Sequence, residues 1–243
     1  MRLDQTLVTR GLAPSRARAQ DLIKRGFVSV GGAVCDKPSF NVKDDRVVSV
    51  ATEAPGYVSR GAEKLAAALD RFGFEASSRV ALDIGASTGG FTEILLEQGA
   101  SRVYAVDVGT AQLHPRLKDD SRVVSLENVD ARALTANEIP DAISAIVVDV
   151  SFISVTKVLD SILKFAAPGC WIVILVKPQF EVGRDNVGSG GIVRDEAARQ
   201  GALDTVRDWV GSQPGWTVIG EMPSPILGGS GNSEFLLGAH YNV

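Results

Sequence analysis

The stretch VALDIGASTGGF, residues 80–91, decides the fold of this chain. Its apolar start indicates a buried strand, and the glycines that follow indicate a tight turn into a helix. Such a turn lets the backbone approach a ligand closely and directs a helix N-terminus at it. A dinucleotide-binding turn would read G-x-G-x-x-G, whereas here Gly85 is followed by Ala86 and Ser87. We therefore expect a ligand site at the end of this strand, with a degenerate NAD-type domain as the alternative.

Strands and helices alternate on the C-terminal side of this turn. Further strands are predicted at 103–106, 123–126, 145–148 and 171–176, with helices that start near 90 and cover 155–165. This alternation is typical of a parallel sheet with helices on both faces. Segments 217–221 and 235–237 add two strands, so we expect an α/β fold with a mostly parallel, seven-stranded, Rossmann-like sheet.

The first sixty residues form a separate pattern. A short helix from Leu3 and a second helix capped by Ser15 are followed by β-like pieces at 28–30, 33–35 and 47–50. Residues 51–56, ATEAPG, have the small residues, Pro and Gly of a linker. We therefore divide the chain into a small α+β domain at 1–52, a linker at 53–58 and the α/β domain at 59–243.

Charge is unevenly distributed between these parts. The chain carries a net charge of −4, but residues 1–60 carry +4 and the remainder −8. A basic domain on an acidic body is typical of a protein in which one part binds a polyanion. On the second helix, Arg16, Arg18 and Arg25 largely avoid the apolar stripe, which fits either such a partner or an ordinary solvated helix face.

Composition argues against several other classes. No run approaches the roughly 18 consecutive apolar residues of a membrane span, and the charged start MRLDQTLVTRG lacks the apolar core of a signal peptide. Cys35 and Cys170 lie far apart without a CxxC or His-rich context, which favours small buried thiols in a reducing compartment and no metal site. We expect a cytoplasmic protein that does not contact a membrane.

The stretch RLDQTLVTRGLAPSRARAQDLIKRGFVSVGG, with KPS further on, resembles an S4 RNA-binding domain. Such domains contact RNA mainly through its phosphates and its shape, so basic side chains are the expected contacts. In this domain we expect them to be Arg2, Arg16, Arg18, Lys24 and Lys37. Nearer the ligand site of the second domain, the candidates are Arg60, Arg132, Arg184 and Arg194.

Asp83, Gly85, Gly89 and Phe91 form the pattern D-x-G-x-x-x-G-x-F, which resembles motif I of S-adenosylmethionine-dependent methyltransferases. This cofactor has no pyrophosphate, so the missing glycine is not required. Asp107 ends the next strand and can accept both ribose hydroxyls, and Asp130 is placed to meet the adenine amino group. The expected cofactor-binding residues are Asp83, Gly85, Ser87, Thr88, Gly89, Gly90, Phe91, Asp107, Val108, Asp130 and Asp149.

Two charged residues end neighbouring strands at the same edge. AIVVDVSFIS places Asp149 at the end of the fourth strand, and WIVILVKPQFE, residues 171–181, places Lys177 at the end of the fifth, where Pro178 stops the pairing. Each charge alone could be an ordinary side chain that reaches water from a strand end. Because ligands bind at the carboxyl edge of an open α/β sheet, opposite charges beside the cofactor turn indicate a reaction site.

Segments along the whole chain, among them VSRGAEKL, DVSFIS, LVKPQFEVG, GGIVRD and SGNSEF, resemble TlyA-type ribosomal RNA 2′-O-ribose methyltransferases, in which an S4 domain precedes an FtsJ-like catalytic domain. The resemblance implies methylation of a cytidine in 23S rRNA and, in one subtype, in 16S rRNA; the short N-terminus favours the large subunit alone. It also implies a catalytic tetrad, carried here by Lys64, Asp149, Lys177 and Glu234. We expect the protein to act on ribosomal subunits as a monomer.

The tetrad suits the attack of a ribose 2′-hydroxyl on a methyl sulfonium, because that hydroxyl must lose a proton. An ordinary lysine has a pKa of about 10.4, so its neutral form costs about 4.6 kcal/mol at pH 7. The four charges balance, and an arriving sulfonium would favour a neutral Lys177 as general base. Asp149 would orient Lys177, while Lys64 and Glu234 would position the hydroxyl. The alternatives are a membrane-active haemolysin, a name that relatives carry, and a non-catalytic ribosome assembly factor.

Overall fold

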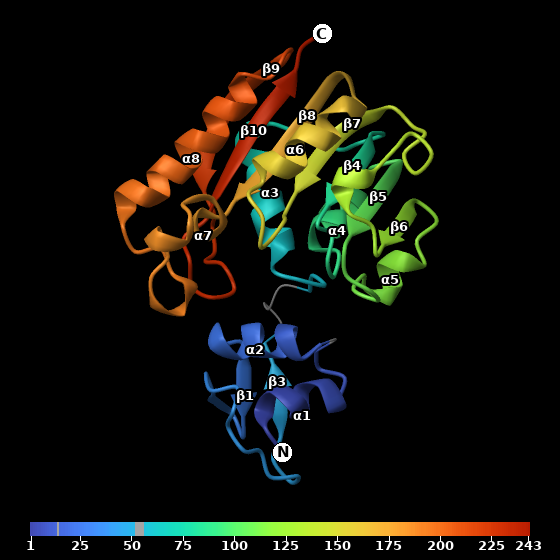
Figure 1. Cartoon of the computed structure of the whole chain (residues 1–243). Coiled ribbons are helices and arrows are strands. Elements are labelled where there is room, and N and C mark those ends of the chain that lie inside the picture. The colour runs from blue at the N-terminus through green and yellow to red at the C-terminus, as the bar shows by residue number, and fades with distance from the viewer. Residues whose placement is uncertain (14, 52–55) are drawn as a thin grey trace. The chain divides into compact units, whose positions relative to one another are not determined.

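The computed structural model describes residues 1–13, 15–51 and 56–243, and the chain divides into two compact units, Met1–Arg60 and Gly61–Val243 (Figure 1). Each unit has its own hydrophobic core. Most of the predicted linker at 51–56 lies outside the described residues.

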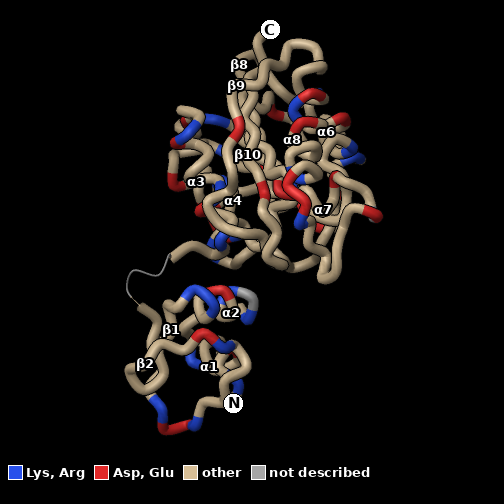
Figure 2. The backbone as a smooth tube through the Cα atoms, turned by 90° about the vertical axis from the view of Figure 1, so that its left-hand side faces the viewer, with Lys and Arg blue, Asp and Glu red and all other residues tan. Residues whose placement is uncertain are grey.

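The small unit combines two helices with a three-stranded antiparallel sheet (Figure 2). The helices are α1 (Leu3–Thr9) and α2 (Arg16–Lys24), and the strands, in the order β2-β1-β3, are β1 (Val28–Val30), β2 (Ala33–Val34) and β3 (Val48–Val50). Ser15 begins α2 as predicted, because its hydroxyl oxygen accepts the backbone N–H of Arg18 at 3.2 Å. Leu3, Leu7 and Ile23 are fully buried between these elements.

The large unit is built on a seven-stranded sheet with the order β6-β5-β4-β7-β8-β10-β9. Its strands are β4 (Val80–Ile84), β5 (Arg102–Asp107), β6 (Val123–Glu127), β7 (Ile143–Val148), β8 (Ala166–Val176), β9 (Trp216–Pro223) and β10 (Phe235–Tyr241). The strands from β6 to β8 run parallel, and β10 pairs antiparallel with both β8 and β9. The predicted α/β fold with a mostly parallel seven-stranded sheet is therefore confirmed.

Helices cover both faces of this sheet, with α6 and α8 on one side and α3 and α4 on the other (Figure 1). The α-helices are α3 (Gly61–Phe72), α4 (Gly90–Glu97), α5 (Pro115–Lys118), α6 (Thr156–Ile162), α7 (Pro178–Glu181) and α8 (Glu196–Gly211). Short 3₁₀ turns are η1 (Ala131–Ala133), η2 (Leu163–Phe165), η3 (Arg184–Asn186) and η4 (Ser189–Gly191). Asp195 begins α8 by accepting the N–H of Ala198 at 3.0 Å, as its sequence position predicts.

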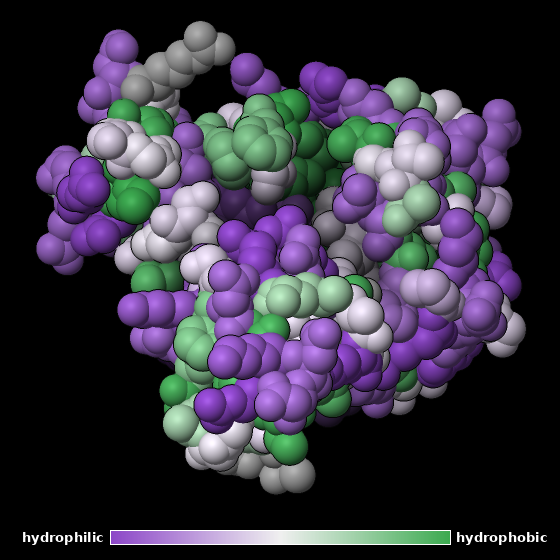
Figure 3. All heavy atoms as spheres, turned by 90° about the horizontal axis from the view of Figure 1, so that it is seen from below, coloured by the Kyte–Doolittle hydropathy of each residue, from purple (hydrophilic) through white to green (hydrophobic). Residues whose placement is uncertain are grey.

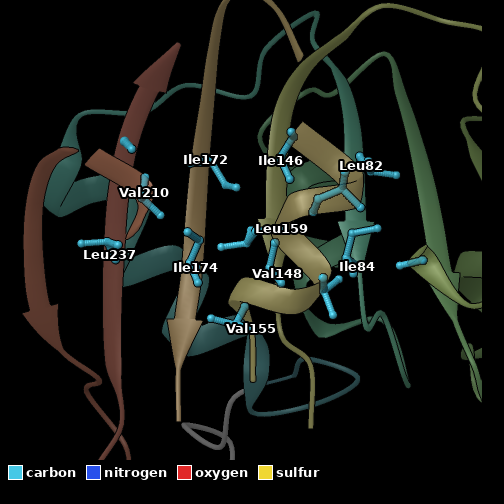
Figure 4. Close-up of a cluster of buried hydrophobic side chains, with 14 of the residues drawn as sticks. Leu82, Ile84, Ile146, Val148, Val155, Leu159, Ile172, Ile174, Val210 and Leu237 are labelled. Carbon is cyan, nitrogen blue, oxygen red and sulfur yellow. The ribbon is translucent and has the colours of Figure 1, made fainter. Parts of the chain in front are cut away.

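The central strands are buried on both faces, which explains their nearly continuous apolar sequence. On one face, branched side chains of β4, β7 and β8 pack against α6 and α8 (Figure 4). Ile146, Ile172 and Leu159 are fully buried there. On the other face, the ring of Phe72 at the end of α3 lies against Gly238, where a Cβ atom would come within 2.7 Å of it. This contact anchors the helix that carries Lys64 beside β10.

Strand β8 is longer than its apolar run, because it begins at Ala166 rather than at Trp171. Ile143 of β7 pairs with Ala166, and the register then shifts before Ala145 pairs with Trp171. The extra segment contains Pro168 and Gly169, residues that are typical of irregular strand positions and that hide a strand from pattern analysis.

Much of the surface seen in Figure 3 is hydrophilic, with hydrophobic residues in scattered patches. Among the described residues, no helix has the length and apolar character needed to cross a bilayer.

Candidate functional site

The glycine-rich turn between β4 and α4 is held by close backbone contacts. Gly85 has φ +82°, and a Cβ atom there would overlap the backbone carbonyl oxygen of Asp149. Gly89 has φ +97° and precedes α4, and a Cβ there would collide with Leu113 and Leu117. Both glycines are therefore required by backbone conformation and by space. The turn lies directly against the backbone that follows β7.

Asp107 fixes the same turn from the next strand. Its carboxylate accepts the N–H of Ser87 at 2.8 Å and the N–H of Gly109 at 2.7 Å. These bonds connect the ends of β4 and β5 around a cavity of about 520 Å³, which lies within the range of small-molecule sites. Of the predicted cofactor-binding residues, the lining includes Gly85, Ser87, Asp107, Val108, Asp130 and Asp149.

The other predicted cofactor residues shape the turn from outside this lining. Phe91 is buried in α4, and the carbonyl oxygen of Thr88 accepts the N–H of His114 at 3.2 Å. Gly89 and Gly90 form the start of α4. These residues therefore contribute to a ligand site by fixing the position of the backbone in the turn.

Asp83 lies behind the turn and is completely buried. One carboxylate oxygen accepts the hydroxyl of Thr92 at 2.6 Å, while Oδ1 has no hydrogen-bond partner in the described part of the chain. Burial raises the pKa of Asp83 to about 7, opposed by the Thr92 hydrogen bond and assisted by the nearby charges of Asp149 and Asp107. Asp83 is therefore poised to carry a proton near neutral pH.

Asp130 and Arg132 lie together at the cavity. Asp130 begins η1, and its carboxylate pairs with the Arg132 guanidinium at 2.6 Å. Hydrogen bonds from the Arg132 side chain and backbone lower the pKa of Asp130. The cavity is thus lined by two carboxylates, Asp107 and Asp130, which the sequence predicts to accept the ribose hydroxyls and the adenine amino group. Acceptors of this kind fit an adenosine-containing cofactor.

The four predicted catalytic residues come together as two ion pairs. Lys64 Nζ on α3 lies 2.5 Å from Glu234 Oε2, and both side chains are almost completely buried, with 7% and 3% exposed. Lys177 Nζ lies 2.5 Å from Asp149 Oδ1, and these side chains are 11% and 25% exposed. Lys177 also donates to the hydroxyl of Ser151 at 2.8 Å.

Strand register brings the two pairs to one edge of the sheet. Phe235 of β10 lies opposite Val176 of β8, so Glu234 and Lys177 occupy the next antiparallel positions. Cross-strand neighbours of this kind have Cβ atoms about 4.5–5.5 Å apart. Asp149 follows β7, the parallel neighbour of β8. The structure therefore places all four side chains at the edge that carries the cofactor turn.

A loop before β10 supports Glu234. A Cβ atom at Gly228 would overlap the Glu234 carboxylate, so this glycine allows the loop to close over the side chain. Asn232 is 1% exposed; its Oδ1 accepts the N–H of Val193 at 2.9 Å, and its Nδ2 donates to the carbonyl of Gly191 at 2.8 Å. The segments GGIVRD and SGNSEF are thereby connected. Sequence reasoning missed Asn232, although it lies two residues before Glu234.

Three further residues near the site were also missed. Ser151, Phe152 and Glu181 lie in the quoted segments DVSFIS and VKPQFE, which were used only for Asp149 and Lys177. Ser151 and Phe152 line the cavity. Phe152 is 92% exposed and has φ +66°, a rare conformation for a bulky residue. The available sequence signal was the apolar pair Phe152 and Ile153, flanked by Ser151 and Ser154 directly after a strand.

The predicted RNA contacts of the small unit have different environments. Lys24 and Lys37 are exposed. Arg2 and Arg16 pair with the buried Asp4, at 3.1 and 2.8 Å. Burial alone would raise the pKa of Asp4, but hydrogen bonds from Arg2, Gln20 and Arg16 hold it well below its usual range. Both arginines nevertheless keep about half of their side chains exposed.

Arg18 and Arg60 have Asp21 as a partner. Arg18 pairs with Asp21 at 2.8 Å and is largely buried, an environment that favours a structural role over contact with a phosphate. Arg60 lies 3.5 Å from the same carboxylate and is partly exposed. Arg194 is exposed, and the side chain of Arg184 lies outside the described residues.

Comparison with known proteins covers both units. The FtsJ-like methyltransferase family matches residues 57–241, and the S4 domain matches residues 1–48. The 16S/23S rRNA (cytidine-2′-O)-methyltransferase TlyA of Mycobacterium tuberculosis is 45% identical over 237 residues, 97% of this chain and 88% of that protein. Hemolysin A of Brachyspira hyodysenteriae is 41% identical over 244 residues, 100% of both chains. A solved structure from Streptococcus thermophilus, whose name describes a hemolysin, has a TM-score of 0.78 at 38% identity and covers 100% of this chain and 88% of that one.

Proposed function

Because this chain belongs to the FtsJ-like family of S-adenosylmethionine-dependent methyltransferases, we propose that it methylates the 2′-hydroxyl of a cytidine ribose in ribosomal RNA. The 23S rRNA is the first substrate to test and 16S rRNA the second, since the M. tuberculosis relative is named for both. The observation that carries the proposal is the Lys177–Asp149 pair, whose carboxylate lines the cavity beside the glycine-rich turn.

The cofactor would occupy this cavity. Asp107 and Asp130 would hold its ribose hydroxyls and adenine, and Gly85 and Ser87 would let the backbone approach it. When bound, S-adenosylmethionine supplies a methyl group on a positively charged sulfonium. The exposed side chain of Val108 offers an apolar surface in the same lining.

Lys177 would act as the general base. Its amine contacts Asp149 Oδ1 and Ser151 Oγ, two residues that line the cavity, and the Lys177 side chain is 11% exposed. With the tetrad arranged as two ion pairs, the site has no excess charge, so a positive charge that arrives in the cavity favours the neutral amine. The neutral amine then accepts the proton of the 2′-hydroxyl.

The buried pair would have a different task. Lys64 and Glu234 lie beside Lys177 but exchange little with solvent, because both side chains are almost fully enclosed. A carboxylate held in this way by its lysine can accept a hydrogen bond from the incoming ribose. We therefore assign positioning of the hydroxyl to this pair.

Phe152 suggests how the nucleotide is presented. Phe152 lines the cavity, is 92% exposed and lies 5.2 Å from the ring of Phe180, so its exposed surface can stack on a base. Enzymes that modify a nucleotide take single-stranded or flipped substrates, because the reacting atom must enter a pocket. We propose that the target base stacks on Phe152 while its ribose reaches Lys177.

The small unit would bind the RNA backbone. We retain the division into 1–52, 53–58 and 59–243 as a proposal, with Lys24, Lys37, Arg2 and Arg16 as phosphate contacts and Arg132 and Arg60 nearer the reaction. Arg18 is left out because of its buried pair with Asp21. A substrate on ribosomal subunits implies action in the cytoplasm, and a complete tetrad within one chain is consistent with a monomer.

The test is a map of ribose methylation on both rRNAs from cells with and without the protein, joined to methyl transfer by the purified protein on isolated subunits. We expect the loss of one cytidine mark in 23S rRNA and its restoration in vitro. Unchanged maps for both subunits would refute the substrate assignment.

The relatives named hemolysins define the second candidate, a membrane-active protein. Incubation of the purified protein with liposomes in the absence of S-adenosylmethionine distinguishes the two. Lysis at protein concentrations that support methylation would favour the membrane activity. Intact liposomes would argue against it and in favour of the methyltransferase.

A further inference from the structure

Two segments meet beside the Lys177 amine. The loop Asp149–Val155 follows β7, and the segment Lys177–Glu181, which contains α7, follows β8. Because β7 and β8 are parallel neighbours, both segments leave the sheet at the same edge. Three contacts connect them beyond the Lys177–Asp149 pair. They are the hydrogen bond from Lys177 to Ser151, the contact between the rings of Phe152 and Phe180, and the hydrogen bond from Ser154 to Glu181.

We propose that Ser151 and Glu181 are positioning residues for Lys177: Ser151 accepts a hydrogen bond from the amine, and Glu181 holds the loop of Ser151 against the helix that follows Lys177. The proposal rests on the role of Lys177 as general base. It adds a second partner for the amine, Ser151, and a support for that partner, Glu181.

The amine needs two acceptors to be oriented. A neutral lysine amine is tetrahedral, with two N–H bonds and one lone pair. Ser151 Oγ accepts one N–H bond at 2.8 Å, and Asp149 Oδ1, an ion-pair contact at 2.5 Å, occupies a second side of the amine. The lone pair then has a single remaining direction, which is what a base aimed at one hydroxyl requires. With Asp149 alone, the amine could rotate about its Cε–Nζ bond and point the lone pair elsewhere.

Glu181 supplies the support. Its Oε2 accepts the hydroxyl of Ser154 at 2.7 Å, and its Oε1 accepts the N–H of Val155 at 2.9 Å. Val155 directly precedes α6, so the carboxylate also satisfies a backbone donor at the start of that helix. Burial raises the pKa of Glu181. A partly buried carboxylate is costly, and its two bonds join the segments that carry Asp149 and Lys177.

Strain in the loop gives an independent reason for such a support. Phe152 lies between the two anchored residues Ser151 and Ser154 and has φ +66°. A bulky residue in this region is strained and persists only where its surroundings impose the conformation. The Phe152 ring lies 5.2 Å from that of Phe180 on α7, the neighbour of Glu181. Without Glu181, the loop would lose the contact that opposes its relaxation.

The experiment measures kcat for methyl transfer to ribosomal subunits between pH 6 and 9. For Ser151→Ala we expect the plateau of kcat to fall about tenfold, a part of the 10²–10⁴-fold that general base catalysis contributes. The ascending limb of the plot of kcat against pH should move to lower pH, because the ammonium form of Lys177 loses a hydrogen-bond acceptor. Ser151→Thr keeps the hydroxyl and should restore both the rate and the profile.

Glu181 is tested by a matched pair of substitutions. Glu181→Gln can still accept from Val155 and donate to Ser154, so it should retain the rate, whereas Glu181→Ala should lower kcat about tenfold. Glu138 provides the control, because its carboxylate also accepts a hydroxyl and a backbone N–H, both from Thr135, in a turn outside the site. Glu138→Ala should leave the profile unchanged.

The outcomes separate this proposal from the base assignment. If Ser151→Ala and Ser151→Thr have the same rate, or if the profile of Ser151→Ala coincides with that of the wild type, the role of Ser151 is overturned. If Glu181→Ala unfolds more easily but keeps its kcat and profile while folded, the role of Glu181 is overturned. If Lys177→Arg retains the wild-type rate, the base assignment fails and this proposal fails with it.

Discussion

The two lysine–carboxylate pairs of the site have the same separation but different environments. Lys64–Glu234 is enclosed between α3 and the loop before β10, whereas Lys177–Asp149 faces the cavity and shares its amine with Ser151. A closed pair behaves as fixed structure, because loss of either charge leaves the other buried. An open pair can exchange a proton with a ligand at modest cost. In the function proposed here, burial and not distance separates the pair that supports from the pair that reacts.

The largest effect should follow from changes to the open pair. Lys177→Arg keeps the charge but cannot act as a base at neutral pH, so we expect methyl transfer to fall by about 10²–10⁴-fold. Methyl transfer by Lys177→Met should fall by a similar factor. Thermal unfolding should show that both variants remain folded, and binding of S-adenosylhomocysteine should persist. Substantial turnover by the arginine variant would remove the distinction between the two pairs.

The closed pair should respond mainly in stability. Lys64→Met leaves Glu234 buried and uncompensated, which should lower the free energy of unfolding by about 3–5 kcal/mol. The double substitution Lys64→Met with Glu234→Leu should recover most of the lost stability, but it should not restore methyl transfer. Chemical denaturation measures both. The exposed pair Arg207–Asp204 is the control, where Asp204→Ala should change stability by about 1 kcal/mol or less. Equal losses of stability at Lys64–Glu234 and at Arg207–Asp204 would contradict the assignment of the closed pair to structural support.

The cofactor turn next to the open pair can be tested separately. Gly85→Ala introduces a Cβ against the Asp149 carbonyl at φ +82°, so we expect binding of S-adenosylhomocysteine to weaken by at least about tenfold. Titration calorimetry measures the affinity. Gly201→Ala on α8, where a Cβ meets nothing within 4 Å, is the control and should stabilise the protein slightly. Unchanged affinity of Gly85→Ala for S-adenosylhomocysteine would show that the turn tolerates the added Cβ atom.

A pH-dependent effect concerns Asp83, a buried carboxylate that has a hydroxyl partner where Glu234 has a lysine. Its folded-state pKa is raised to about 7, above the value of about 4 in an unfolded chain, so its contribution to stability is present at low pH and is lost as pH rises toward 7. Wild-type stability should therefore decline relative to Asp83→Asn by about 1.4 kcal/mol per pH unit between pH 4 and 7. Denaturant unfolding at several pH values provides the measurement, and parallel curves would contradict the raised pKa.

The sequence pattern was sufficient for the fold, because strand burial, helix caps and the glycine turn are local signals. Ser15 begins its helix where predicted. The four tetrad residues came from the family resemblance, and the structure brings them together as two ion pairs. The pattern could not show how the tetrad divides into pairs, since Lys64 and Glu234 are 170 residues apart. It also missed Ser151 and Glu181, whose importance depends on hydrogen bonds between two loops. For Arg18, periodicity placed the side chain off the apolar stripe, but only the structure shows its pair with Asp21.

The antiparallel register of β10 has a consequence for insertions and deletions. Glu234 reaches its position because Phe235 lies opposite Val176. A residue added within β10 would turn every following side chain to the other face of the sheet, and one added between Glu234 and Phe235 would move the carboxylate away from Lys64. The segment 224–227, between β9 and Gly228, carries no such constraint from strand pairing. Homologous chains that differ in length should therefore differ there, while the spacing from Glu234 into β10 stays constant.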